Sequence, residues 1–201
     1  MLKTASEMPH STRGKPVAMR QLLLLRHAKS SWDDDALEDQ ARPLNPRGRL
    51  AVAALREAMR NLGLLPDLVL VSPATRTRQT LAALEPWDET PLIDEMEVLY
   101  LAEAPRLLAI LRAVPETTRS VMLVGHNPGL QELTLRLIGA GAVSPADANV
   151  RRLAASFPTA GLVEFAFPEP WSSLGNSDTR LQRFLDPREL PGAEASQAGL
   201  D

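Results

Sequence analysis

The sequence of 201 residues contains no cysteine. This absence excludes disulfide bonds, thiolate metal ligands and cysteine nucleophiles, and it fits a cytoplasmic protein. Long apolar runs are also missing, since the longest early one, Leu22–Leu25, is too short for a signal-peptide core or a membrane span. Positive charge is not in excess, and the net charge of -3 gives no reason to expect binding to nucleic acid or to a membrane.

The length suits one domain with a sizeable core and is short for two. We expect this domain to occupy residues 19–188. Residues 1–18 form a polar, irregular segment that we interpret as a leader, and Met19 could serve as an alternative start. Residues 189–201 combine Pro, Gly, Ala, Ser and Glu without periodicity, which indicates a flexible tail. We expect a monomer.

Four segments pair a proline with helical periodicity and therefore predict helices. These helices begin at Pro46, Pro73, Pro105 and Pro128. Short apolar runs between and after them predict strands at Gln21–Leu25, Asp67–Val71, Ser120–Val124 and Gly161–Phe167, with an edge strand at Arg180–Leu185. Strands that alternate with helices predict an α/β sandwich around a mostly parallel sheet.

Polar side chains follow three of the predicted strands. In chain order they are Arg26 and His27, then Ser72 and Arg76, then His126 and Asn127. Because ligands bind beyond the carboxyl ends of the strands in an open α/β sheet, we expect these side chains to meet at one rim.

This set of side chains predicts a phosphate site. Arg26 and Arg76 offer planar forks for bidentate contact with phosphate oxygens, and Ser72, His126 and Asn127 are further phosphate-binding candidates. Helices that begin at Pro73 and Pro128 would direct N–H groups to the same place. A neutral imidazole can attack phosphorus and carry the phosphoryl group as a covalent intermediate. Since phosphoryl transfer depends mostly on positioning and charge, we predict a phosphatase that needs no metal or other cofactor.

Four motifs resemble those of the histidine phosphatase superfamily, which shares its fold with the cofactor-dependent phosphoglycerate mutases. The first runs from Arg26 to Trp32, continues with Asp39, Arg42-Pro43-Leu44-Asn45 and Gly48, and is similar to the SixA-type phosphohistidine phosphatases. The others are Ser72–Thr77 with Gln79-Thr80, Gly125–Gly129 and Phe157–Gly161. Alanine at position 28 replaces the superfamily glycine and is usual for the SixA-like branch. The resemblance covers roughly residues 20–190.

The resemblance implies a three-layer α/β/α, phosphoglycerate mutase-like fold with a mixed sheet. It implies that His27 accepts the phosphoryl group and that Arg26, Arg76 and His126 form the phosphate pocket. In the mutases and many phosphomonoesterases a glutamate protonates the leaving oxygen. The corresponding region here offers Glu97 and Glu103, and no motif singles out either of them.

The substrate class follows from the leaving group and from the length of the chain. Imidazole leaves phosphorus more readily than an alkoxide, so a phosphohistidine substrate relaxes the need for a strong acid. No long insertion separates the motifs to form a lid over a small substrate. We therefore predict signal transduction through a phosphorylated protein partner, such as a histidine phosphotransfer domain. The alternative is a small-molecule phosphomonoesterase that uses Glu97 or Glu103 as its acid.

Three other functions have less support from the sequence. Asp33-Asp34-Asp35 with two histidines could be a metal site, but carboxylate triplets in loops are usually solvated, and no closely spaced ligand pair is present. A phosphoglycerate mutase needs a closed site, which the missing insertion argues against. A non-catalytic phosphate-binding module has no support, because His27, His126 and both arginines are present.

Overall fold

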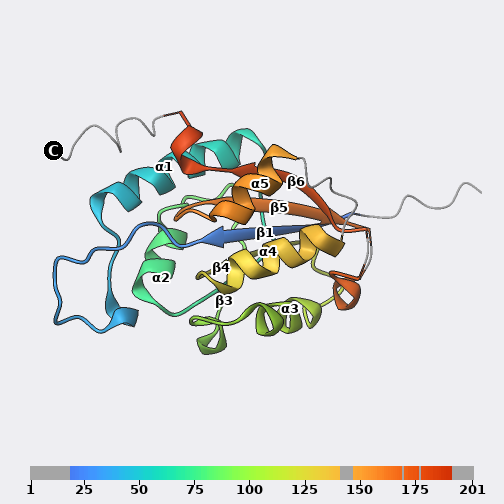
Figure 1. Ribbon diagram of the computed structural model, residues 1–201, viewed down its shortest axis with the longest axis horizontal. Coiled ribbons are helices and arrows are strands. Elements are labelled where there is room, and N and C mark those ends of the chain that lie inside the picture. Colours follow the sequence, from blue (N-terminus) through green and yellow to red (C-terminus); the bar gives the residue numbers. More distant parts are fainter. Residues whose placement is uncertain (1–18, 141–146, 169, 177, 192–201) are drawn as a thin grey trace, which may run out of the picture.

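A six-stranded mixed sheet forms the centre of the fold (Figure 1). The computed structural model describes residues 19–140, 147–168, 170–176 and 178–191. The strand order is β3-β2-β4-β1-β5-β6. The strands are β1 (Arg20–Arg26), β2 (Leu68–Val71), β3 (Leu92–Glu95), β4 (Ser120–Gly125), β5 (Leu162–Phe167) and β6 (Arg180–Leu185). Strands β1 to β4 pair in parallel, β5 runs antiparallel to β1, and β6 runs antiparallel to β5.

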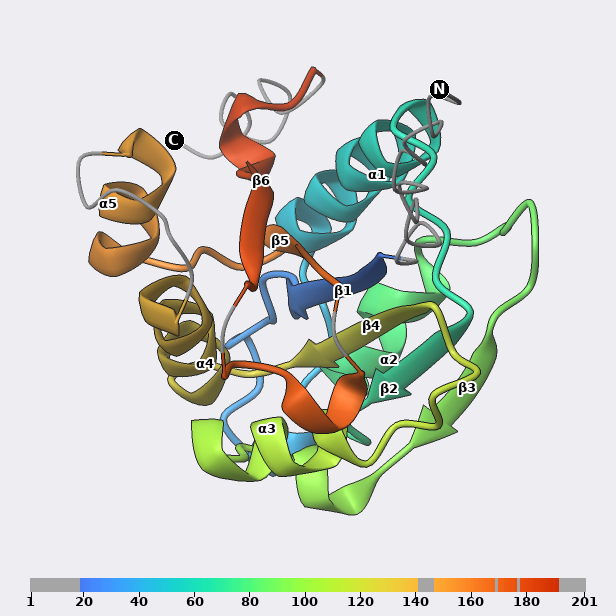
Figure 2. The same ribbon diagram turned by 90° about the vertical axis from the view of Figure 1, so that its right-hand side faces the viewer.

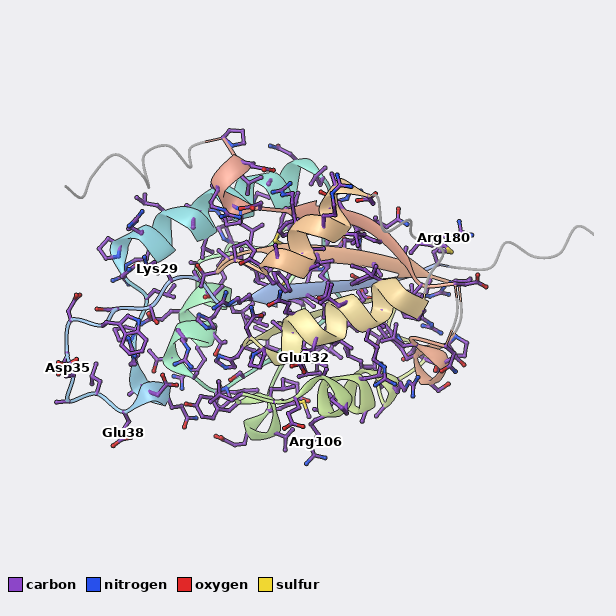
Figure 3. All side chains as sticks on the ribbon, viewed as in Figure 1. Lys29, Asp35, Glu38, Arg106, Glu132 and Arg180 are labelled. Atoms are coloured by element: carbon purple, nitrogen blue, oxygen red, sulfur yellow. The ribbon has the colours of Figure 1, made fainter. Side chains whose placement is uncertain are left out.

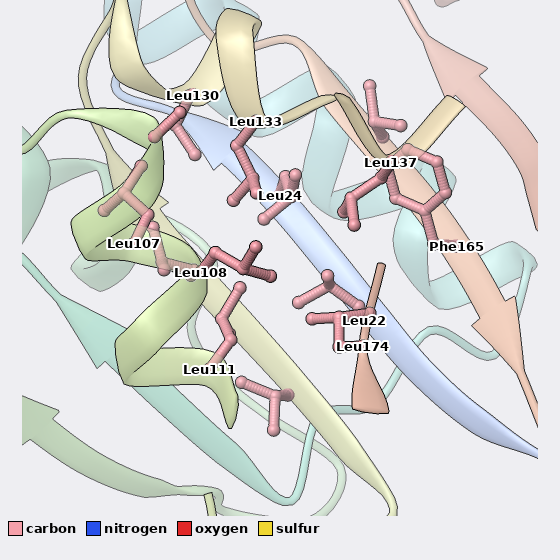
Figure 4. Close-up of a cluster of buried hydrophobic side chains, with 14 of the residues drawn as sticks. Leu22, Leu24, Leu107, Leu108, Leu111, Leu130, Leu133, Leu137, Phe165 and Leu174 are labelled. Carbon is pink, nitrogen blue, oxygen red and sulfur yellow. The ribbon is translucent and has the colours of Figure 1, made fainter. Parts of the chain in front are cut away.

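Helices cover both faces of the sheet and complete three layers (Figure 2). They are α1 (Pro46–Asn61), α2 (Thr75–Ala82), α3 (Ala104–Arg112), α4 (Gly129–Ala140) and α5 (Ala148–Ala155). Successive side chains of a strand point to opposite faces, and β1 shows this alternation. Leu22 and Leu24 join the core cluster under α3, α4 and α5, which Figure 4 shows in part. Leu23 and Leu25 join the cluster under α1 and α2.

The predicted α/β/α architecture with a mostly parallel mixed sheet is confirmed, and β6 is an edge strand as expected. Two elements were missed. The edge strand β3 has four exposed residues and therefore carries no buried apolar run, and α5 buries only Leu153. No helix in the described ranges has both the length and the apolar character that crossing a bilayer requires.

Two predicted helix starts are too early, because α2 begins at Thr75 and α4 at Gly129. The Ser72 N–H still bonds the β4 backbone, and the Thr77 hydroxyl contacts the carbonyls of Ser72 and Ala74. These bonds hold the residues before α2 in a bend.

The described structure continues for three residues past position 188, the predicted end of the domain. Glu189, which we assigned to the tail, lies in a short 3-10 helix, Pro187–Glu189, and pairs with Arg152 of α5. The predicted leader, residues 1–18, and residues 192–201 of the tail lie outside the described residues.

A glycine in the first turn of α1 lets this helix approach the loop that follows β1. A Cβ at Gly48 would overlap the backbone carbonyl of Lys29. The Gly48 N–H also donates to the side chain of Asn45, which caps the helix. Since both partners of the close contact are backbone, neither can move aside without displacing the segment after His27.

We predict that Gly48→Ala lowers the free energy of unfolding by about 2 kcal/mol, because the new methyl group forces two backbone segments apart. Gly139→Ala is the matched control, since it adds the same methyl group to a helical glycine with open space around it. This control should raise the free energy of unfolding by about 0.5–1 kcal/mol through helix propensity. Urea denaturation of both variants measures the difference, and equal effects would contradict the packing argument.

Candidate active site

One cavity of about 590 Å³ opens beyond the carboxyl ends of the central strands. Lys29, one of its lining residues, lies at the opposite end of the molecule from Arg180 (Figure 3). The lining includes five of the eight side chains proposed from the sequence: Arg26, His27, Arg76, His126 and Asn127. The other lining residues are Lys29, Ser30, Trp32, Asp39, Leu101 and Thr159.

His27 follows β1 and is held on both sides. Its backbone N–H donates to Gly125 of β4, and the next N–H, that of Ala28, donates to the Thr80 hydroxyl of α2. The ring Nδ1 lies 2.8 Å from the Ala28 carbonyl, which can only accept, so Nδ1 carries the proton. Burial, together with the charges of Arg76 and Arg26, lowers the pKa of His27 to about 4. At neutral pH the ring is therefore uncharged, and Nε2 has a free electron pair.

Arg26 is a cation without a carboxylate partner among the described residues. One terminal nitrogen donates to the Phe157 carbonyl at 2.7 Å, while its buried Nε has no hydrogen-bond partner there. Burial lowers the pKa of Arg26, which means that its positive charge is poorly solvated. A phosphoryl dianion in the cavity would supply both the missing charge and a missing acceptor.

Arg76, in the first turn of α2, reaches the cavity with its side chain 6% exposed. Both terminal nitrogens donate to Asp39: NH1 to its carbonyl and NH2 to its carboxylate, the latter at 2.8 Å. Tyr100 donates its hydroxyl to the same carboxylate at 2.6 Å. An arginine carries five N–H donors, so Arg76 retains three that Asp39 does not use.

His126 lies at the end of β4, with its ring centroid 5.1 Å from that of His27. Burial, followed by the charges of His27 and Arg76, lowers the pKa of His126 to about 3. The Ser72 hydroxyl lies 2.7 Å from its Nε2, so the Nδ1 edge is the one that faces Arg76, at 3.5 Å. Ser72 is fully buried and does not line the cavity. The structure therefore places Ser72 behind His126 and not among the groups that could touch phosphate.

Asn127 lines the cavity, and its amide nitrogen donates to the Phe157 carbonyl at 3.1 Å. This carbonyl also accepts from Arg26, so the segment before β5 orients two of the lining residues. Thr159 of the same segment lines the cavity itself. The fourth sequence motif, Phe157–Gly161, thus lies at the site.

Neither predicted general acid reaches the cavity. Glu97 and Glu103 are exposed, and neither belongs to its lining. Among the described residues, the one carboxylate that lines the cavity is that of Asp39. The hydrogen bond from Tyr100, followed by the bonds and the charge of Arg76, lowers the pKa of Asp39. At neutral pH this carboxylate is ionised and cannot donate a proton.

No group of three or more histidine, aspartate or glutamate side chains in the described ranges is arranged to hold a metal ion. Asp33 and Asp34 instead bond within their own loop, to Ser31 and to the backbone of Ala36. This geometry does not support the metal reading of Asp33-Asp34-Asp35.

Several residues that line the cavity were not among those predicted from the sequence. Lys29, Ser30, Trp32 and Asp39 lie within the first family motif, so that motif could have identified them. Leu101 carries no such signal. It reaches the cavity because the segment after β3 turns there, with a positive φ of 48° at this residue.

The fold and the site define an α/β protein in which two arginines and a neutral histidine line one cavity. The sequence profile of the histidine phosphatase superfamily (branch 1) matches residues 22–103. A chloroplastic, uncharacterized protein of Arabidopsis thaliana is 36% identical over 132 residues, 60% of each chain. An uncharacterized protein of Mycobacterium tuberculosis is 34% identical over 166 residues, which are 82% of this chain and all of that protein.

Similar solved structures indicate to which branch of the superfamily the chain is most similar. The proposed phosphohistidine phosphatase SixA of Nakamurella multipartitia superposes with a TM-score of 0.75 and 28% identity, over 86% of this chain and 99% of that one. Its counterpart from Agrobacterium tumefaciens gives 0.70 and 31%, over 84% and 98%. The chain belongs to the histidine phosphatase superfamily, in its SixA-type branch, and these matches identify it as a metal-independent phosphatase.

We predict that protonation of His27 destabilises the protein below neutral pH. Because the folded pKa of about 4 lies below the ordinary value of 6.5, the unfolded state binds more protons between these two values. The free energy of unfolding should therefore fall by about 3 kcal/mol from this group as the pH drops through that window.

Urea denaturation between pH 7 and pH 4 measures this contribution, with His27→Gln as the control that cannot titrate. The loss of stability should be smaller in the variant. Identical pH profiles for the two proteins would show that His27 is not buried in its neutral form.

Proposed function

We propose that the protein removes phosphoryl groups from phosphohistidine on a partner protein, through a covalent intermediate on His27. The observation that carries this proposal is the state of the one carboxylate that lines the cavity among the described residues. Asp39 is bound by Arg76 and Tyr100 and stays ionised, so the site has no carboxylic acid to protonate a leaving group.

In the first step the Nε2 electron pair of His27 attacks phosphorus. A new P–N bond forms to His27 as the P–N bond of the substrate breaks. A phosphohistidine that is protonated on its other ring nitrogen leaves as neutral imidazole and needs no proton from the enzyme. An alkyl phosphate would leave as an alkoxide and would need one, which favours the phosphohistidine substrate.

In the second step water attacks the phosphoryl group on His27. The P–N bond to Nε2 breaks, its electron pair returns to the ring, and inorganic phosphate and a proton are released. Nδ1 keeps its proton throughout because the Nδ1–H donates a hydrogen bond to the Ala28 carbonyl. The phosphorylated ring is therefore cationic and already a good leaving group, while Arg26 and Arg76 stabilise the charge on the phosphoryl oxygens.

The rim of the cavity supports a protein substrate. Trp32 and Leu101 line the cavity, yet they are 73% and 51% exposed. Arg42 is buried and lies over one face of the Trp32 ring, which holds this large side chain at the rim. Exposed apolar side chains around a site commonly contact another macromolecule. A histidine phosphotransfer domain in the cytoplasm is the class of partner that we propose.

The test is phosphoryl release in the presence of a chelator, from a phosphohistidine carrier protein and separately from an aryl phosphate. We predict rapid loss of the phosphohistidine label with the native protein. Turnover by His27→Ala should fall by at least about 10³-fold, because the other imidazole of the lining, His126, has its Nε2 beside the Ser72 hydroxyl and its Nδ1 facing Arg76. Acid-labile, alkali-stable phosphate trapped on the native protein would identify the intermediate.

Glu97→Gln and Glu103→Gln are the control variants for the alternative function. Both variants should release phosphate from phosphohistidine at the native rate, since neither side chain lines the cavity. Brisk aryl phosphate hydrolysis with an untouched phosphohistidine would instead make the protein a small-molecule phosphomonoesterase. Loss of that activity in either variant would identify its general acid.

We predict that Trp32→Ala lowers kcat/KM for the phosphorylated protein about tenfold more than for phosphoramidate, because only the protein is large enough to cover the exposed ring. Leu92→Ala is the matched control: Leu92 is 75% exposed, and it lies at the opposite end of the sheet, where β3 begins. Parallel losses on both substrates for Trp32→Ala would show that Trp32 does not contact a protein partner.

A further inference from the structure

Asp39 places a negative charge inside a pocket whose proposed ligand is a dianion. Its side chain is 53% exposed, lines the cavity and approaches Arg76 NH2 to 2.8 Å. The backbone carbonyl of the same residue accepts a hydrogen bond from the other terminal nitrogen of Arg76. Asp39 thus occupies one edge of the guanidinium, and a phosphoryl group would have to use the donors that remain.

The other charges around the cavity determine how strongly the Asp39 carboxylate affects phosphate binding. Arg26, Lys29 and Arg76 are cations that line it, while His27 and His126 are neutral. Three cations alone would bind any phosphate dianion strongly, including the inorganic phosphate that the reaction releases. An ionised carboxylate on the same lining opposes the binding of that product.

We propose that Asp39 weakens the affinity of the pocket for free inorganic phosphate, so that the product leaves and the resting site stays open. The carboxylate acts through charge, whereas the Asp39 carbonyl continues to hold Arg76 in place. This inference rests on the proposed phosphate pocket and assigns a role to a residue that the reaction steps do not use. It concerns specificity between product and substrate, because a phosphoprotein gains contacts at the rim that phosphate lacks.

Asp39→Asn separates the two contributions of the residue. The amide keeps an oxygen that can accept from Arg76 or Tyr100, and the backbone carbonyl is unchanged, so only the charge is lost. Two unit charges a few ångströms apart near a protein surface interact by enough to change an affinity by about tenfold or more. If Asp39 only held Arg76 in place, its replacement would weaken phosphate binding, so the sign of the change distinguishes the two roles.

The experiment is calorimetric titration of the full-length native protein and its variants with inorganic phosphate at pH 7.5. We expect the Kd for phosphate to fall about tenfold in Asp39→Asn. Asp39→Ala should shift the Kd in the same direction, which guards against an effect peculiar to the amide. Glu38→Gln is the matched control, because it removes one negative charge from the adjacent exposed residue, which does not line the cavity. Its Kd should stay within about twofold of the native value.

An unchanged or higher Kd in Asp39→Asn, with phosphate bound by the native protein, would overturn the role of Asp39 and leave the proposed function standing. An equal fall in Glu38→Gln would also overturn it, because the effect would then be one of net charge. Absence of phosphate binding to the native protein and to every variant would reject the phosphate pocket itself, and the inference with it.

Discussion

Burial of two uncharged imidazoles among arginines is the constraint on which the site depends. His27 and His126 lie 5.1 Å apart, and two protonated rings at that distance would repel each other in a poorly solvated space. Burial and the neighbouring cations keep both rings neutral, with pKa values of about 4 and 3. The positive charge of the pocket then resides on arginines, which do not lose it, while His27 remains free to act as a nucleophile.

The scaffold holds this arrangement through hydrogen bonds between side chains and the backbone of neighbouring segments. The Thr80 hydroxyl accepts from the Ala28 N–H and lies 2.6 Å from the Arg76 carbonyl, so one buried side chain links the segment after β1 to α2. The Phe157 carbonyl accepts from Arg26 and from Asn127. The carboxyl ends of the parallel strands and the start of the antiparallel strand β5 lie at one edge of the sheet, which explains why residues up to 131 positions apart converge.

The sequence predicts a site residue where its position at a strand end or a helix start is enough to place it in the site. It does not predict residues that reach the site through contacts across loops. Arg26, His27, Arg76 and His126 each follow a strand directly or open the next helix, so strand ends alone predict that they meet. Ser72 also stands at a strand end, but the bend before α2 turns its hydroxyl toward the back of the His126 ring. Glu97 and Glu103 were predicted only because they lie in the region of the chain where related enzymes carry a general acid. Asp39 reaches Arg76 across a loop, and no periodicity encodes such a contact.

The position of Asp39 also limits the chemistry that the site can perform. A carboxyl group acts as a general acid only if its environment raises its pKa, as an apolar pocket does. Asp39 has the opposite environment, since Tyr100 and Arg76 both stabilise its ionised form. A site whose lining carboxylate cannot give up a proton suits substrates that carry their own protonated leaving group. Phosphohistidine meets this condition because its imidazole has a second nitrogen, whereas the bridging oxygen of an alkyl phosphate must obtain its proton elsewhere.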